Sequence, residues 1–371
     1  MTLEEIEAAI RQRLGSSAVE LVPLLRLQDG GPVIAERLPN MFTPEQVCTE
    51  YESVFRPWEL MGLYLLNTDR AWDAHAVLWA LYDHQLQFQE QRRTRVNKAT
   101  PLIWIGECHR LAGHPLLTQR YMMLALIEDA IASKGSIKLQ STGVLFRLRL
   151  YSGMPDSTLR DYARRAYEVY SGNPESGLYP EWIMQELNDD WVTAVPSPAE
   201  ALIYLPNRRY LQTLIERLGS EEGKALESLG AYMISVMPGC RTATRQRTPN
   251  TDYDIVCSVE GSEVDFRSEL GRYFLCECKD WDRPADFTAI AKFVRVLQGA
   301  KARFGIFFAR QGISGEGKLR DAALEQRDAF RELGIVVVVV AQEDLEAVSI
   351  GSNFIAILRQ KYRQVRLGLS S

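Results

Sequence analysis

The sequence predicts a two-part protein, in which an all-helical region precedes an α/β domain whose mixed sheet is covered by helices on both faces. Three observations predict this fold class. The chain has 371 residues, a length that suggests two or three domains. Apolar residues recur at helical spacing through residue 220. After it, short β-branched and aromatic runs alternate with helical segments. The expected parts are a helical domain at 1–200, a connecting helix at 201–220 and an α/β domain at 221–371.

Composition places the chain among ordinary globular proteins. Apolar residues make up 46% and charged residues 25%, which excludes disordered and collagen-like chains. No apolar run reaches the roughly 18 residues of a membrane helix, so no membrane partner is expected. The N-terminus is acidic and does not resemble a signal peptide. Six cysteines without a C-x-x-C pair indicate neither a disulfide framework nor structural zinc. We therefore expect a cytoplasmic protein.

The net charge of −5 gives no global signal for nucleic-acid binding. The acidic excess lies in residues 1–220, whereas the 21 Lys and Arg from residue 221 onward equal the 21 Asp and Glu. Only the local patch meets the phosphates, so a neutral domain can still bind nucleic acid.

The N-terminal region carries apolar residues three and four positions apart and shows no alternating strand pattern. The expected helices are Leu3–Leu14, Trp58–Leu66, Ala71–Gln91, Pro101–Leu111, Leu116–Ser133, Gly143–Tyr151 and Thr158–Tyr170, and Leu205–Leu218 is the connecting helix.

Small residues mark the predicted crossings between these helices. Gly62 with Ala74 and Gly106 with Ala125 form a pattern that resembles tetratricopeptide repeats, in which a small residue admits a large side chain from the partner helix. Gly62 and Gly106 lie 44 residues apart, against about 34 in that family. The interpretation is therefore helical hairpins of tetratricopeptide type, and an ordinary helical domain is the alternative. A stacked array would offer a concave surface to a protein or ligand partner.

All four histidines, His75, His84, His109 and His114, lie in this region. None is four residues from another, so packing is a better explanation for them than a metal site.

The C-terminal part predicts a mixed sheet. Arg241–Thr248 is short and extended, and the segments around it alternate between helical and strand patterns. The expected helices are Glu222–Val236, Phe287–Gln298, Gly317–Leu333, Asp344–Val348 and Phe354–Tyr362, and the expected strands are Asp254–Val259, Arg272–Lys279, Phe304–Ala309 and Gly334–Ala341.

Charged residues interrupt the apolar strands of this part. Asp254 begins one strand, and Glu277 and Lys279 end the next on a shared face, because strand side chains alternate. Cys276 and Cys278 point to the other face. Unpaired charges on a central strand are costly, so these residues indicate a site.

Glu227 on a helix, Asp254, and then Glu277-Cys-Lys279 together resemble the PD-(D/E)xK nuclease superfamily. The likeness is nearest to the catalytic domain of Mrr-type restriction endonucleases and covers about residues 221–345. Tyr253 stands where that motif often has proline. Asp252 competes with Asp254 for the aspartate role.

The resemblance implies a metal-dependent endonuclease that hydrolyses phosphodiester bonds. Double-stranded DNA is the expected substrate, and RNA is the alternative that the sequence leaves open. Asp254 and Glu277 would bind Mg²⁺, for which Mn²⁺ is an expected substitute. Lys279 would orient the attacking water or neutralise the phosphate, and Glu227 would complete the site through water or Lys279. Phosphate contacts are expected from Arg241, Arg245, Arg247, Lys292 and Arg295.

Other interpretations remain open. In the simplest interpretation, Glu277 and Lys279 form an ion pair on an exposed strand and bind no metal. Each of the five residues expected to contact phosphate could equally be an ordinary surface residue. The alternative function is a non-catalytic interaction or nucleic-acid-binding protein built on a degenerate nuclease fold. A helical region joined to a nuclease resembles prokaryotic anti-phage defence effectors, a role that rests on analogy. A homo-oligomer is a further possible state.

Overall fold

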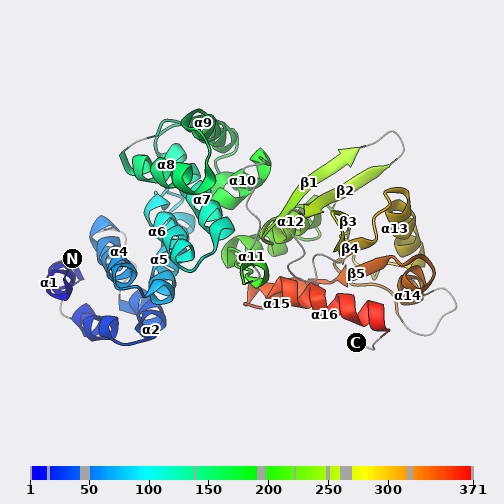
Figure 1. Ribbon diagram of the computed structural model, residues 1–371, viewed down its shortest axis with the longest axis horizontal. Helices are drawn as coiled ribbons and strands as arrows, with labels where there is room; N and C mark the ends of the chain where they lie inside the picture. Colours follow the sequence, from blue (N-terminus) through cyan, green and yellow to red (C-terminus); the bar gives the residue numbers. More distant parts are fainter. Residues whose placement is uncertain are drawn as a thin grey trace. The chain divides into compact units, whose positions relative to one another are not determined.

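A computed structural model describes residues 2–14, 17–41, 51–137, 139–189, 197, 199–220, 223–247, 251–259, 270–315 and 321–368. The chain divides into two compact units, Met1–Val192 and Thr193–Ser371 (Figure 1). The division falls shortly before residue 200, where the sequence placed the end of the first domain. Each unit is described by itself.

The first unit is helical, and its described residues contain no strand. Helices η1, α2 and α10 were missed by the periodicity. Helix α2 begins at the pair Gly30–Gly31, which resembles a turn in the sequence and so conceals the helix. The elements are α1 (Leu3–Leu14), η1 (Ser17–Arg26), α2 (Gly30–Arg37), η2 (Leu38–Met41), α4 (Tyr51–Asn67), α5 (Ala71–Arg92), α6 (Ala99–Leu111), α7 (Pro115–Ala132), α8 (Leu139–Ser152), α9 (Asp156–Gly172), η3 (Ser176–Leu178) and α10 (Pro180–Leu187).

Glycines set the close approach of neighbouring helices in this unit. A Cβ atom at Gly62 of α4 would lie 2.6 Å from Leu78 Cδ2 of α5. At Gly106 of α6 it would lie 2.9 Å from Met122 Cε of α7. Both glycines therefore admit a large side chain from the next helix, as the sequence pattern predicted.

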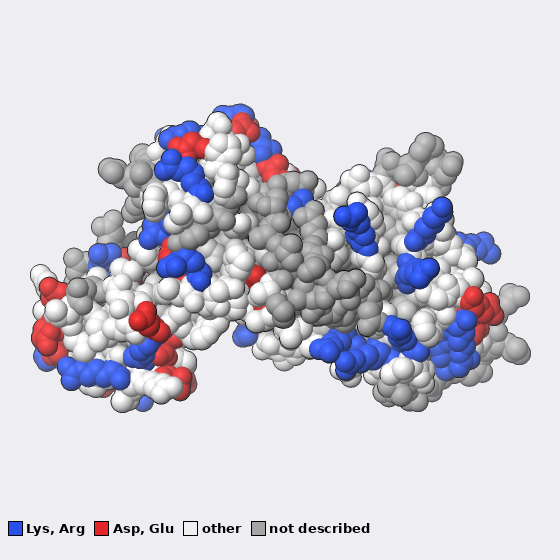
Figure 2. Space-filling view, viewed as in Figure 1, with Lys and Arg blue, Asp and Glu red and all other residues white. Residues whose placement is uncertain are grey.

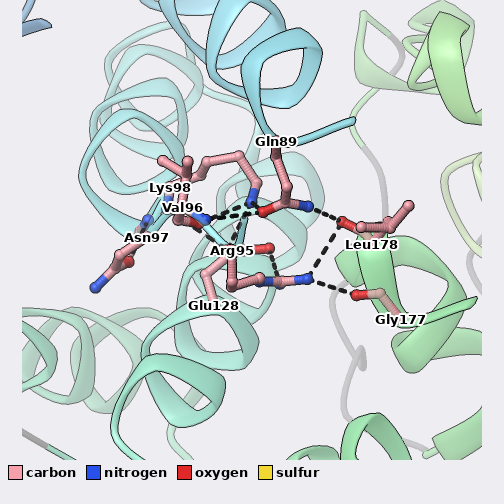
Figure 3. Close-up of polar contacts among 9 residues, drawn as sticks. Gln89, Arg95, Val96, Asn97, Lys98, Glu128, Gly177 and Leu178 are labelled. Carbon is pink, nitrogen blue, oxygen red and sulfur yellow. Dashed lines mark hydrogen bonds and ion pairs between the residues drawn. The ribbon is translucent and has the colours of Figure 1, made fainter. Parts of the chain in front are cut away.

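A buried ionic network joins the α5–α6 connection to α7 and η3 (Figure 3). Lys98 and Glu128 are both fully buried, with Lys98 Nζ 3.0 Å from Glu128 Oε2. Arg95 pairs with the other oxygen of Glu128 at 2.5 Å. Gln89 Oε1 accepts from Lys98 Nζ at 2.8 Å, and Gln89 Nε2 donates to the Leu178 carbonyl at 2.9 Å. Burial lowers the pKa of Lys98 to about 8, although Glu128 opposes that shift.

The second unit contains one mixed sheet with strand order β1-β2-β3-β4-β5. Strands β1, β2 and β3 pair antiparallel, and β3, β4 and β5 pair parallel. The elements are η4 (Glu200–Leu202), α11 (Arg208–Glu216), α12 (Lys224–Ser235), β1 (Cys240–Arg247), β2 (Asp252–Val259), β3 (Tyr273–Lys279), α13 (Phe287–Gly299), β4 (Phe304–Ala309), α14 (Ala322–Leu333), β5 (Val336–Val340), α15 (Gln342–Ser349) and α16 (Phe354–Leu367).

Helices cover both faces of this sheet. On one face, Leu275 and Phe307 belong to the apolar core that contains Phe293 of α13. On the other face, Gly230 of α12 packs so closely that an added Cβ would lie 3.1 Å from both Ile255 and Phe308. The expected mixed sheet with helices on both sides is therefore present.

The segment expected to connect the two parts packs within the second unit. The rings of Tyr210 of α11 and Tyr232 of α12 meet edge to face at 4.7 Å. The Tyr232 hydroxyl accepts from the Asn207 backbone N–H at 2.7 Å.

Helix α14 begins at Ala322, and the side chain of Asp321 caps it by accepting from the Ala323 backbone N–H. The start expected at Gly317 lies outside the described residues. No helix in the described ranges is long and apolar enough to cross a membrane.

Candidate active site

Two carboxylates face each other where β2 begins and β3 ends. The register pairs Ile255 with Cys276, so Asp254 and Glu277 lie at the next position of the antiparallel ladder. Asp254 Oδ2 accepts a hydrogen bond from the Cys278 backbone N–H at 2.8 Å. This bond fixes the Asp254 carboxylate at the end of β3. Of the two candidate aspartates, Asp254 is therefore the one whose side chain is hydrogen-bonded to β3, the strand that carries Glu277. Asp252 is exposed at the first position of β2.

Lys279 and Glu277 share one face of β3, as their spacing predicted. Lys279 Nζ donates to Glu277 Oε1 at 2.5 Å, and both side chains are mostly buried. Burial raises the pKa of Glu277 and so does Asp254, while Lys279 opposes the shift. Burial alone would lower the pKa of Lys279, but Glu277 and Asp254 raise it. The Lys279 ammonium also lies 5.7 Å from the centre of the Trp281 ring, within cation–π range.

The cysteines between these residues point away from the site. Cys276 and Cys278 are buried, and burial raises the pKa of each thiol well above its ordinary value. They are therefore protonated packing residues, which agrees with the alternation predicted for this strand.

Glu227 and Arg245 form an ion pair that the sequence did not predict. Arg245 Nε donates to Glu227 Oε2 at 2.6 Å, with the Arg245 side chain 51% exposed. Arg245 has a φ of 52°, which is unusual within a strand. The register around it places Arg245 opposite Asp254, and Asp254 adds to the rise in the pKa of Arg245. The sequence predicts that Glu227 acts through Lys279 or water and that Arg245 contacts a phosphate. The structure instead joins the two side chains to each other.

A second charge cluster supports the ends of β3 and β4 and was missed from the sequence. Arg310 Nε lies 2.6 Å from Asp280 Oδ1, and Arg310 also contacts Asp282. Asp280 Oδ2 accepts from the Gly219 backbone N–H at 2.7 Å. The sequence contained a signal for this cluster: two aspartates flank Trp281, and an arginine directly follows the neighbouring strand.

The expected phosphate-binding residues lie on two elements. Lys292 and Arg295 are exposed on α13, and the charge of Lys292 lowers the pKa of Glu277, which places Lys292 near the carboxylates. Arg241 is half-buried on β1. Arg247 ends β1 and pairs with Asp252 in the register, but its side chain lies outside the described residues.

The donor set suits a hard divalent cation. Asp254 and Glu277 supply carboxylate oxygens, the ligands that Mg²⁺ takes in ones or twos while keeping its own water. Asp254 raises the pKa of the buried Glu277 carboxyl, so a cation between them would relieve a repulsion. Among the described residues no group of three His, Cys, Asp or Glu could hold a metal. The fit therefore rests on two carboxylates.

Three of the four histidines come together in the helical unit. His109 Nδ1 lies 3.4 Å from His114 Nδ1, and the ring centres of His75 and His109 are 5.0 Å apart. The half-exposed Trp72 contacts all three rings. Burial lowers the pKa of His75 to about 4 and that of His109 to about 2. Both histidines are therefore neutral packing residues at physiological pH.

No family model, curated protein or solved structure matches this chain. The residues at the junction of β2 and β3 are therefore the basis for a functional assignment.

Proposed function

We propose that this protein is a metal-dependent nuclease of the PD-(D/E)xK type, and that the second unit contains its active site. The observation that supports the proposal is the meeting of Asp254, Glu277 and Lys279 on one face at the end of the β2–β3 pair. Burial of charge is costly, so two acidic side chains and one amine on two neighbouring interior strands indicate a function. Hydrolysis of a phosphodiester is the function that we propose for them.

Each residue has a distinct role in this proposal. Asp254 and Glu277 would hold Mg²⁺, which supplies a more acidic bound water and polarises a phosphoryl oxygen. Lys279 Nζ lies at Glu277 Oε1, where its amino group is placed to orient the attacking water or to neutralise a phosphate oxygen. The role of Glu227 is indirect: it pairs with Arg245 and so holds that residue opposite Asp254.

Cleavage of supercoiled plasmid DNA and of RNA, in Mg²⁺ and in EDTA, tests the proposal. Asp254→Asn keeps an oxygen for the Cys278 N–H, and Lys279→Met keeps most of the side-chain volume, so both variants should fold. We expect each to lose cleavage by about 10²-fold or more. Glu332→Gln, at an exposed site on α14, is the matched control and should cleave like wild type. Absence of Mg²⁺-dependent cleavage in the wild type would favour the non-catalytic interaction protein.

The first unit supports a sensing or docking role. Its helices α4 to α7 contact one another in chain order, and Gly62 and Gly106 each receive a side chain from the following helix. Stacked hairpins of tetratricopeptide type would present a surface to a protein or ligand that controls the nuclease. A defence effector is the biological setting to which this pairing belongs by analogy.

A further inference from the structure

A groove on the second unit lies along α16, separate from the carboxylate site. Its volume is about 660 Å³. Leu202 and Asn353 complete its lining at the side. The lining residues on α16 are two apolar residues, two arginines and two glutamines: Ile355, Ala356, Arg359, Gln360, Arg363 and Gln364. Arg359 and Arg363 are one helical turn apart, as are Gln360 and Gln364. The groove therefore presents two parallel pairs of hydrogen-bond donors.

The charged residues that line this groove are both basic. Helix α16 carries four basic residues and no acidic residue in the sequence FIAILRQKYRQVRL. Lys361 is neutralised by Asp344, 2.9 Å away. Arg359 and Arg363 are exposed, and neither has an ion-pair partner among the residues that the structure describes. Figure 2 shows Lys and Arg side chains gathered over α16.

An uncompensated arginine pair is suited to one class of ligand. Guanidinium groups bind phosphate oxygens through paired N–H donors, and side chains four residues apart on a helix start about 5–6 Å from each other. That spacing lets them reach successive phosphates of one strand. The amides of Gln360 and Gln364 can donate to sugar or phosphate oxygens, while Leu202, 45% exposed, offers an apolar contact.

We propose that the α16 groove binds the sugar-phosphate backbone of a nucleic acid, with Arg359 and Arg363 each contacting a phosphate. This inference rests on the proposed nuclease function for the identity of the ligand. It adds a contact surface away from β1 and α13, the elements on which the sequence placed all the phosphate-binding residues. A contact of this kind positions the strand without reading its sequence.

The experiment measures equilibrium binding of a labelled DNA duplex to the full-length protein. Fluorescence anisotropy is the readout, in EDTA and at several salt concentrations. Arg359→Gln/Arg363→Gln removes both charges and keeps residues that favour helix. The matched control is Arg327→Gln/Arg331→Gln on α14, which removes two exposed arginines at the same spacing. We expect the α16 variant to bind more weakly and its salt slope to fall by about 2, since each phosphate contact contributes about 1. The α14 variant should keep the wild-type slope.

A second variant separates the groove from simple charge. Ala356→Trp keeps both arginines but fills the groove, so it should also weaken binding. Wild-type affinity and slope in both α16 variants would overturn the proposal, and so would equal losses in the α14 control. Tighter DNA binding by the arginine variant would also overturn it, because loss of two phosphate contacts can only weaken binding. Plasmid cleavage by the same wild-type preparation tests the nuclease activity independently of these outcomes.

Discussion

The buried Glu128 is expected to be the most sensitive charged residue of the helical unit. Its two oxygens bind different cations, Lys98 at 3.0 Å and Arg95 at 2.5 Å. Changing Glu128 to Gln keeps the shape of the side chain but removes the carboxylate that these two cations share. Among the described residues, Lys98 would then keep its hydrogen bonds to Gln89 and to the Val96 carbonyl.

The loss of stability depends on which buried charge the substitution leaves without its partner. Removing one partner of a buried ion pair costs about 3–5 kcal/mol, and we expect Glu128→Gln to fall in that range. Lys98→Met should cost less, about 1–2 kcal/mol, because Arg95 still pairs with Glu128 and the costly burial of the ammonium disappears. Gln89 Oε1 also retains the Val96 N–H as a donor at 3.0 Å.

Tryptophan fluorescence in urea measures this difference, because six of the seven tryptophans lie before residue 193. The signal therefore reports mainly on the helical unit. The control is Glu168→Gln on α9, which breaks an exposed pair with Arg164 and should change stability by less than about 1 kcal/mol. Equal losses for Glu128→Gln and Lys98→Met, or a loss at Glu128 no larger than at Glu168, would refute the reasoning.

Three further predictions concern packing and pH. Because His75 and His109 have folded pKa values of about 4 and 2, against about 6.5 when unfolded, the unfolded chain binds more protons below pH 6.5. The helical unit should lose about 2 kcal/mol per histidine between pH 6.5 and 5 in urea titrations, and His109→Phe should reduce that loss; a pH-independent midpoint would contradict it. Gly31→Ala would place a Cβ 2.3 Å from the Asp73 carbonyl oxygen, so it should destabilise that unit by about 1–3 kcal/mol; a urea midpoint equal to that of wild type would contradict this. Gly305→Ala would meet a Phe293 ring atom at 2.7 Å and should lower the thermal midpoint of the second unit; an unchanged midpoint would show that α13 moves freely.

Much of the fold was predictable, because it follows from local periodicity. The helix Leu3–Leu14 and the strand Phe304–Ala309 have the bounds that the sequence predicted. Helix α4 begins at Tyr51 and contains Pro57, whereas the sequence placed its start after that proline. Proline lacks an N–H and is tolerated best in the first turn of a helix. A prediction from sequence therefore places the start of α4 next to Pro57, later than the start in the structure.

The candidate site was predictable only in part. Alternation along β3 fixed the shared face of Glu277 and Lys279, and the structure has that arrangement. The pairing of Glu227 with Arg245 depends on where α12 lies against β1 and on the positive φ of Arg245. Neither can be calculated from local sequence. The histidine cluster was missed for the same reason, since α5 and α6 bring together residues that are far apart in the chain.

The alternation of Glu277 and Lys279 with two buried cysteines on β3 limits how this protein can evolve. The same seven-residue strand presents the charged pair on one face and core packing on the other. An insertion or deletion of one residue within it would exchange the two faces, sending the charges into the core and the thiols into the site. Point substitutions can adjust either face of this strand and keep the two faces distinct, whereas a shift of register cannot.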